Sequence, residues 1–160
     1  PIECAQTISQ PFTVAFMTQI LEVKPGDKIL EIGTGSGYQA AILSKLGAEV
    51  YSVERIEKLH ENAKALLAEL GYNVFLKLDD GTLGWEEFAP YNKIIVTAGA
   101  PDIPNHLVEQ LSDNGKLIVP VGDQQSQRLL MLTNLKEGLV KKYYDYFKFV
   151  PLIGEDGWKA

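Results

Sequence analysis

The sequence predicts one α/β domain over residues 1–160, with a doubly wound, mostly parallel sheet that ends in an antiparallel hairpin. Short apolar runs alternate with segments of helical spacing along most of the chain, which is typical of a parallel sheet with helices on both faces. A glycine-rich turn at 33–37 follows the first apolar run directly. Two long segments, 128–134 and 139–149, flank the Lys136-Glu-Gly138 turn and predict the hairpin.

Composition narrows the class of partner. A net charge of −6, with no basic run beyond Lys141-Lys142, argues against a nucleic-acid partner. No apolar run is long enough to span a membrane. Cys4 is the only cysteine, so we expect neither disulfides nor a cysteine metal site. A reducing, cytoplasmic compartment is expected for the same reason. We also expect a monomer without a bound metal.

The chain begins with a loop that leads into a helix at 12–23. Ser9 or Gln10 can cap this helix, and Pro11 suits its first position because the proline lacks an N–H that would be unpaired there anyway. The helix is followed by a turn at 24–27, which contains a proline and a glycine.

The next stretch carries the strongest signal in the chain. An apolar run at 29–32 predicts a buried strand, Gly33, Gly35 and Gly37 follow it, and 38–46 has helical spacing. Glycines permit positive φ and let a ligand approach the backbone without meeting a Cβ. The strand, turn and helix together predict a cradle for an adenosine-bearing ligand.

The remaining elements place further polar groups at the same edge of the sheet. The second strand, 49–53, ends at Glu54, about twenty positions beyond the glycine turn, where a carboxylate can accept both ribose hydroxyls. A long helix ended by Gly71 carries an apolar stripe of Ile56, Leu59, Ala63, Leu66 and Leu70. Strands are then expected at 74–78, 92–97 and 116–121, with a short helix at 104–111 and a turn at 113–115. Asp80-Gly81 and Thr97-Ala98 follow strand ends, where ligands of open α/β sheets bind.

The spacing of the glycines favours a ligand without phosphate. A dinucleotide fingerprint requires a small residue where this chain has Tyr38, and no P-loop lysine follows. Glu31 and Glu54 suit a cationic sulfonium better than a diphosphate, although Glu31 can equally be a structural carboxylate. The motif resembles the first motif of class I S-adenosylmethionine-dependent methyltransferases; a dinucleotide enzyme and a purely structural turn are the weaker alternatives.

Further motifs resemble the protein-L-isoaspartate O-methyltransferase family, in family order along essentially the whole chain. They are Gln6-Thr-Ile-Ser-Gln-Pro11, Glu31-Ile-Gly-Thr-Gly-Ser-Gly-Tyr-Gln39, Asp80-Gly-Thr-Leu-Gly-Trp85, Ile95-Val-Thr-Ala-Gly-Ala-Pro101, Gly115-Lys-Leu-Ile-Val-Pro-Val-Gly122 and Phe149-Val-Pro-Leu152. The resemblance implies methyl transfer from S-adenosyl-L-methionine to the free carboxylate of isoaspartyl peptides and proteins, with S-adenosyl-L-homocysteine as product, in protein repair.

The resemblance also implies roles for individual residues. Ser9 is expected to be the active-site hydroxyl and to contact the substrate. The expected cofactor-binding residues are Gln6, Thr7, Ile8, Gly33, Thr34, Gly35, Ser36, Gly37, Glu54, Asp80 and Gly81, with Asp80 and Gly81 at the adenine. Pro120, Val121 and Gln127 are expected on the peptide-binding side. On spacing alone, Ser9 is better explained as a helix cap, and the resemblance reverses that preference.

The chemistry fits this set of residues. A carboxylate is already ionised at neutral pH, so its methylation needs no general base, and rate comes from alignment and loss of water. Glu3 and Ala5 depart from the glycines that the family carries there, and the family's N-terminal segment is expected to be missing. A methyltransferase for another acceptor and a cofactor-binding module without turnover are the alternatives, because the cofactor half of such a fold does not specify the acceptor.

Overall fold

A computed structural model describes residues 10–160, and within them the strands form one seven-stranded sheet of order β3-β2-β1-β4-β5-β6-β7. The strands are β1 (Lys28–Ile32), β2 (Glu49–Glu54), β3 (Val74–Leu78), β4 (Tyr91–Val96), β5 (Leu111–Gly122), β6 (Gln127–Leu135) and β7 (Gly138–Phe147). The first five are parallel, whereas β6 and β7 are antiparallel to their neighbours. The predicted fold class and the C-terminal hairpin are therefore confirmed.

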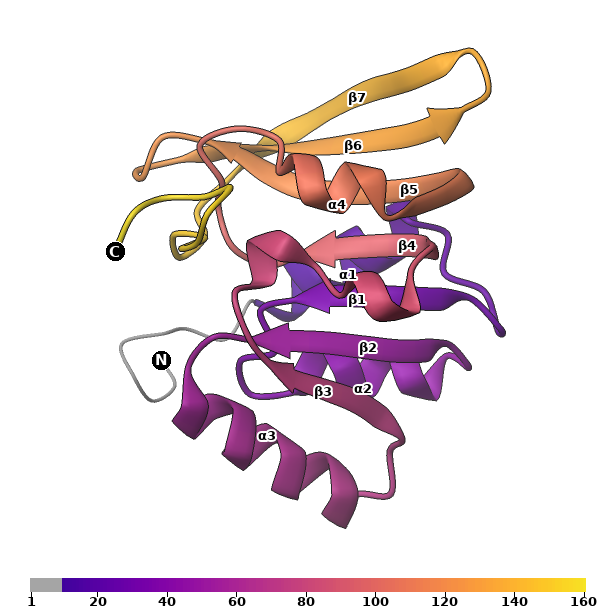
Figure 1. The fold of residues 1–160 in the computed structure, drawn as a ribbon, viewed down its shortest axis with the longest axis vertical. Helices are drawn as coiled ribbons and strands as arrows, with labels where there is room; N and C mark the ends of the chain where they lie inside the picture. The colour runs from indigo at the N-terminus through magenta and orange to yellow at the C-terminus, as the bar shows by residue number, and fades with distance from the viewer. Residues whose placement is uncertain (1–9) are drawn as a thin grey trace.

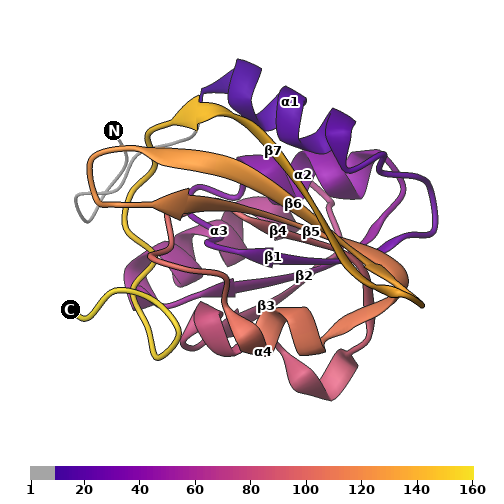
Figure 2. The same ribbon diagram turned by 90° about the horizontal axis from the view of Figure 1, so that it is seen from above.

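Helices cover both faces of the sheet (Figures 1 and 2). One face carries α1 (Pro11–Ile20), α2 (Tyr38–Lys45) and α3 (Glu57–Glu69). The other carries α4 (Asn105–Glu109) and the 3₁₀ turns η1 (Gly81–Leu83) and η2 (Glu86–Phe88). Among residues 10–160, none of the helices is both long and apolar enough to cross a bilayer.

The central strands are buried on both faces and feed two separate cores. In β1, Ile29 packs with α1 and α2, whereas its neighbour Leu30 packs on the opposite face with α4. This alternation follows from the two-residue period of a strand, so a continuous apolar run fills both cores at once. Figure 1 shows that β1, β2 and β4 end at the same edge of the sheet, beside the C-terminal segment.

The first helix is shorter than predicted. Pro11 takes the first helical position as expected, and Gln10 precedes it in extended conformation without a side-chain cap bond. The helix ends at Ile20 rather than at residue 23, because Glu22 adopts a positive φ of 54° that cannot continue an α-helix.

The predicted apolar stripe of α3 is partly wrong. Its buried residues are Leu59, Ala63 and Leu67, whereas Leu66 and Leu70 are 44% and 58% exposed. The helix packs over β2 and over β3, which is the edge strand. Side chains on the outer flank of the helix therefore have no neighbouring strand to cover them. The residues that contact the sheet, Leu59, Ala63 and Leu67, are spaced four apart.

Strand β5 begins at Leu111, five residues before the predicted start. Tyr91 of β4 pairs with Leu111 and Lys93 pairs with Lys116, so the residues between form a bulge in the ladder. Asn114, at a φ of 61°, lies in this bulge. The predicted turn at 113–115 is therefore an irregularity inside the strand, and α4 ends earlier, at Glu109.

Candidate functional site

A crevice open to solvent, whose empty volume of about 800 Å³ includes part of that solvent, lies at the carboxyl ends of β1, β2 and β4. Six residues predicted to bind the cofactor line it: Gly33, Thr34, Gly35, Ser36, Glu54 and Gly81. Thr97 and Ala98, expected at this edge from the sequence, also line the crevice, together with residues not assigned from the sequence, among them Val14, Tyr38, Arg55 and Val150–Ile153.

The glycine turn takes the left-handed conformations for which glycine is needed. Gly33 has a φ of +96°, and a Cβ there would lie 2.9 Å from Thr97 Oγ1. Gly35 has a φ of 55°. Gly37 does not line the crevice, since it precedes α2 and a Cβ there would meet Leu67 of α3 at 3.4 Å. Gly33 and Gly35 thus keep the floor of the crevice free of side chains, and Gly37 permits close helix packing behind it.

Glu54 ties the end of β2 to the glycine turn. Its Oε1 accepts a hydrogen bond from the Gly35 N–H and its Oε2 accepts one from the Ile56 N–H, both at 2.9 Å. The side chain is buried yet lines the crevice. Each carboxylate oxygen can accept a further bond, so the ribose role of Glu54 stays a prediction with a suitable geometry.

Glu31 lies behind the turn and does not line the crevice. Its Oε1 accepts a 2.5 Å hydrogen bond from Ser52 Oγ, which lies 2.6 Å from Thr34 Oγ1. Because a hydroxyl has one proton, Thr34 donates to Ser52 and Ser52 donates to Glu31. Within residues 10–160, Glu31 Oε2 has no partner. The carboxyl is thus anchored by hydroxyls rather than by loop N–H groups.

Burial raises the pKa of Glu31 to about 8; the Ser52 hydrogen bond opposes this rise and the nearby charge of Glu54 adds to it. Glu31 is therefore mainly neutral at pH 7. Of the two carboxylates expected to favour a cation, Glu54 is the one that reaches the crevice.

Asp80 and Gly81 have different structural roles: Gly81 lines the crevice and Asp80 accepts hydrogen bonds from two other segments. Gly81 lines the crevice, and a Cβ there would meet Ile32 Cγ2 at 2.5 Å. Asp80 Oδ1 accepts bonds from the N–H and the hydroxyl of Thr82, and Oδ2 accepts one from the Glu155 N–H at 2.8 Å. Asp80 therefore caps η1 and holds the C-terminal segment, while its contact with adenine stays a prediction.

The wall formed by Val150–Ile153 was not assigned from the sequence. The Gly99 N–H donates to the Val150 carbonyl at 2.8 Å, and the Leu152 N–H donates to the Gly99 carbonyl at 2.9 Å. These bonds fasten the segment to the loop after β4. The motif Phe149-Val-Pro-Leu152 was the only available signal, and nothing in its local pattern indicates where it packs.

The residues expected on the peptide side do not line the crevice. Gln127 is buried, with Nε2 donating to the Asp123 carbonyl and Oε1 accepting from the Phe149 N–H. Val121 forms an isolated bridge with Ala100. Their roles, and that of Pro120, stay predictions. Gln6, Thr7, Ile8 and Ser9 lie outside the described residues.

Comparisons with known proteins are consistent over nearly the whole chain. A sequence profile described as protein-L-isoaspartate(D-aspartate) O-methyltransferase (PCMT) matches residues 1–157. A protein-L-isoaspartate O-methyltransferase of Chlorobium limicola is 52% identical over 99% of this chain and 74% of its own length. One from Dictyoglomus thermophilum is 54% identical over 99% of this chain and 73% of its own length.

Solved structures agree with the sequence comparisons. A protein-L-isoaspartate O-methyltransferase superposes with a TM-score of 0.87 at 33% identity, over 94% of this chain and 49% of that one. A protein from Plasmodium falciparum described as beta-aspartate methyltransferase (PCMT), in complex with S-adenosyl-L-homocysteine, has a TM-score of 0.85 at 27% identity, over 96% of this chain and 78% of that one.

Proposed function

The chain belongs to the protein-L-isoaspartate(D-aspartate) O-methyltransferase family, and from this premise we propose which of its residues carry the reaction. It is an enzyme that transfers a methyl group from S-adenosyl-L-methionine to the free carboxylate of isoaspartyl residues in damaged proteins. The observation that carries the residue assignments is the glycine-floored crevice beside the Glu54 carboxylate.

The residues present fit an adenosyl sulfonium. Gly33 and Gly35 leave backbone exposed where any Cβ would be strained or would crowd Thr97. Glu54 provides a carboxylate that suits ribose hydroxyls. Among the lining residues that the structure describes, Arg55 is the one cationic side chain, so the crevice lacks the cationic cluster that a diphosphate favours. We assign the adenosyl and methionine portions to this floor.

When bound, S-adenosyl-L-methionine supplies a methyl group made electrophilic by its sulfonium. The acceptor carboxylate is already an anion at neutral pH, so no residue has to remove a proton. The chain contributes alignment and exclusion of water, for which apolar side chains such as Val14 and Leu152 line the crevice. Ser9, outside the described residues, is proposed to donate its hydroxyl proton to the acceptor carboxylate and so orient it.

Three measurements test this proposal. Calorimetry with S-adenosyl-L-homocysteine should show binding, and an isoaspartyl peptide should bind more tightly to the resulting complex. Methyl transfer should occur to the isoaspartyl peptide and not to its aspartyl twin; equal transfer to both, or transfer only to another acceptor, would refute the assignment. Ser9→Ala should lower kcat and leave the affinity for S-adenosyl-L-homocysteine unchanged, which separates its proposed role from that of a helix cap.

We further propose that the chain works as a cytoplasmic monomer and as a single domain. The lone Cys4 supports the assignment to a reducing compartment. Sedimentation at micromolar concentration should give the mass of one chain, with and without S-adenosyl-L-homocysteine; a stable dimer would contradict the monomer assignment.

A further inference from the structure

Residues 154–158 form a tight turn that folds back on itself. The Gly154 N–H donates to the Trp158 carbonyl at 3.1 Å, and the Trp158 N–H donates to the Leu152 carbonyl at 2.8 Å. The indole Nε1–H of Trp158 donates to the Gly99 carbonyl at 3.1 Å. We call this segment the C-terminal turn; it directly follows the crevice wall formed by Val150–Ile153.

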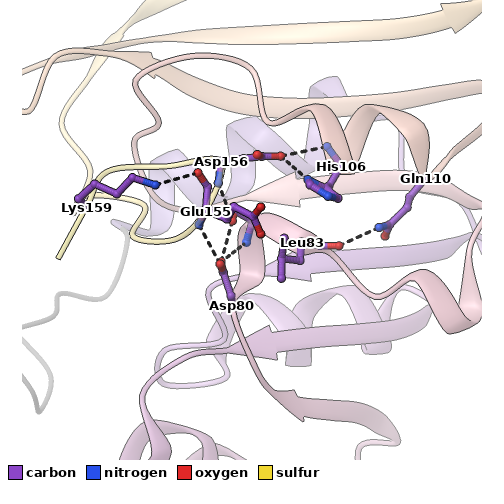
Figure 3. Close-up of polar contacts among 8 residues, drawn as sticks. Asp80, Leu83, His106, Gln110, Glu155, Asp156 and Lys159 are labelled. Atoms are coloured by element: carbon purple, nitrogen blue, oxygen red, sulfur yellow. Dashed lines mark hydrogen bonds and ion pairs between the residues drawn. The ribbon is translucent and has the colours of Figure 1, made fainter.

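Two backbone N–H groups attach the C-terminal turn to the loop after β3. The Glu155 N–H donates to Asp80 Oδ2 at 2.8 Å, and the Asp156 N–H donates to Thr82 Oγ1 at 3.1 Å. Figure 3 shows the Asp80 carboxylate beside this turn. Asp80 and Thr82 adjoin Gly81, which lines the crevice. The attachment therefore joins two walls of the same site.

A third attachment comes from helix α4. Both the backbone N–H and the ring Nδ1 of His106 contact Asp156 Oδ2, at 3.2 and 2.5 Å (Figure 3). The Asp156 side chain is 22% exposed and that of His106 is 44% exposed. Asp156 is thus the side chain through which the C-terminal turn is hydrogen-bonded to α4.

We propose that His106 is a positioning residue for the methyl-transfer reaction: by holding Asp156, it keeps the C-terminal turn against Thr82 and so fixes the crevice wall formed by Val150–Ile153. His106 lies outside the crevice lining. Its effect passes through the short covalent connection between Ile153 and Asp156. This inference rests on the proposed function, because it concerns the same crevice.

Charge makes the contact dependent on pH. The hydrogen bond and the negative charge of Asp156 raise the pKa of His106, with smaller contributions from Glu155 and Glu109, while burial opposes the rise. Burial by itself would raise the pKa of Asp156, but the bonds and charge of His106, together with Lys159, hold it below its ordinary value. The charge-assisted contact is therefore complete below the ordinary pKa of histidine and weakens as pH rises through the elevated value.

The test compares variants that remove or keep the donor. His106→Ala removes the ring contact, whereas His106→Asn keeps an N–H donor near the Nδ1 position and cannot titrate. His60→Ala removes the other histidine of the chain and is the matched control. Loss of one hydrogen bond corresponds to roughly 2- to 10-fold in affinity, so we expect the Kd for S-adenosyl-L-homocysteine to rise by that factor in His106→Ala.

The pH profile separates positioning from general stability. Between about pH 6 and pH 9, wild type and His60→Ala should lose affinity as pH rises, and His106→Asn should show near wild-type affinity at low pH with a flatter profile. A readout without cofactor accompanies this: amide exchange at Glu155 and Asp156 should quicken in His106→Ala, while exchange in β1 stays unchanged.

Failure of the proposed function and failure of the positioning role of His106 give different results. If wild-type protein does not bind S-adenosyl-L-homocysteine, the proposed function fails, and exchange at the Glu155 and Asp156 amides still decides whether His106 holds the turn. If His106→Ala leaves both that exchange and the affinity unchanged, the positioning role is wrong. It is equally wrong if His106→Asn keeps the full pH dependence of wild type.

Discussion

Replacement of Glu31 by glutamine should make the protein more stable at neutral and alkaline pH. Glu31 is fully buried in β1, and Ser52 donates to its Oε1. Glutamine has nearly the shape of the protonated carboxyl and keeps the oxygen that accepts this bond. The variant therefore removes the ionisation, while its amide nitrogen, like Oε2, finds no partner among residues 10–160, a cost that does not depend on pH.

The size of the effect follows from the raised pKa of Glu31. Burial lifts it from 4.5 to about 8, so between these values the folded state holds a proton that the unfolded state has lost. Stability conferred by the neutral group therefore falls as pH rises through that window, by about 1.4 kcal/mol per pH unit. From pH 5 to pH 8 the loss amounts to about 4 kcal/mol in wild type, and the glutamine variant does not suffer it.

Urea denaturation at several pH values measures this directly. The difference in unfolding free energy between Glu31→Gln and wild type should grow by about 4 kcal/mol from pH 5 to pH 8 and stay constant above it. Ionisable groups that do not interact with Glu31 cancel in the difference. Glu69→Gln, which changes an exposed carboxyl at the end of α3, should leave the profile unaltered. Parallel curves across the whole range, or a Glu31→Gln variant that is less stable at pH 8, would refute the reasoning.

One further substitution probes the floor of the crevice, and a pair of substitutions probes the packing of α3. Gly33→Ala places a Cβ 2.9 Å from Thr97 Oγ1 at a φ of +96°, so we expect roughly 1–3 kcal/mol of destabilisation. Binding of S-adenosyl-L-homocysteine should also be weaker in a calorimetric titration. Unchanged affinity would show that the turn does not hold the cofactor. Leu67→Ala, at a buried position, should lower the free energy of unfolding by about 2–5 kcal/mol in urea denaturation. Leu66→Ala, at an exposed position, should change it by no more than about 0.5 kcal/mol. The reverse order would support the apolar stripe predicted from the sequence.

The local sequence pattern was sufficient to predict the conformation of a segment wherever residues close by in the sequence decide it. The apolar run before Gly33 could be interpreted as a buried strand, because a two-residue period places its side chains on both faces without reference to distant residues. The positive φ of Gly33 and Gly71 follows likewise from turn chemistry. The pattern was ambiguous where burial depends on which strand lies opposite a helix. It could not decide whether Leu66 or Leu67 of α3 faces the sheet.

The sequence by itself determined the fold class, the glycine turn and the family, since these depend on short motifs and on periodicity. Only the tertiary structure decided that Glu31 is neutral, because its pKa depends on burial and on Ser52, 21 residues away. Only the tertiary structure decided that the C-terminal turn is tied to α4 beside the crevice wall, because His106 and Asp156 are 50 residues apart. Contacts between segments so distant in the chain carry no local periodicity, and packing of the whole sheet brings them together.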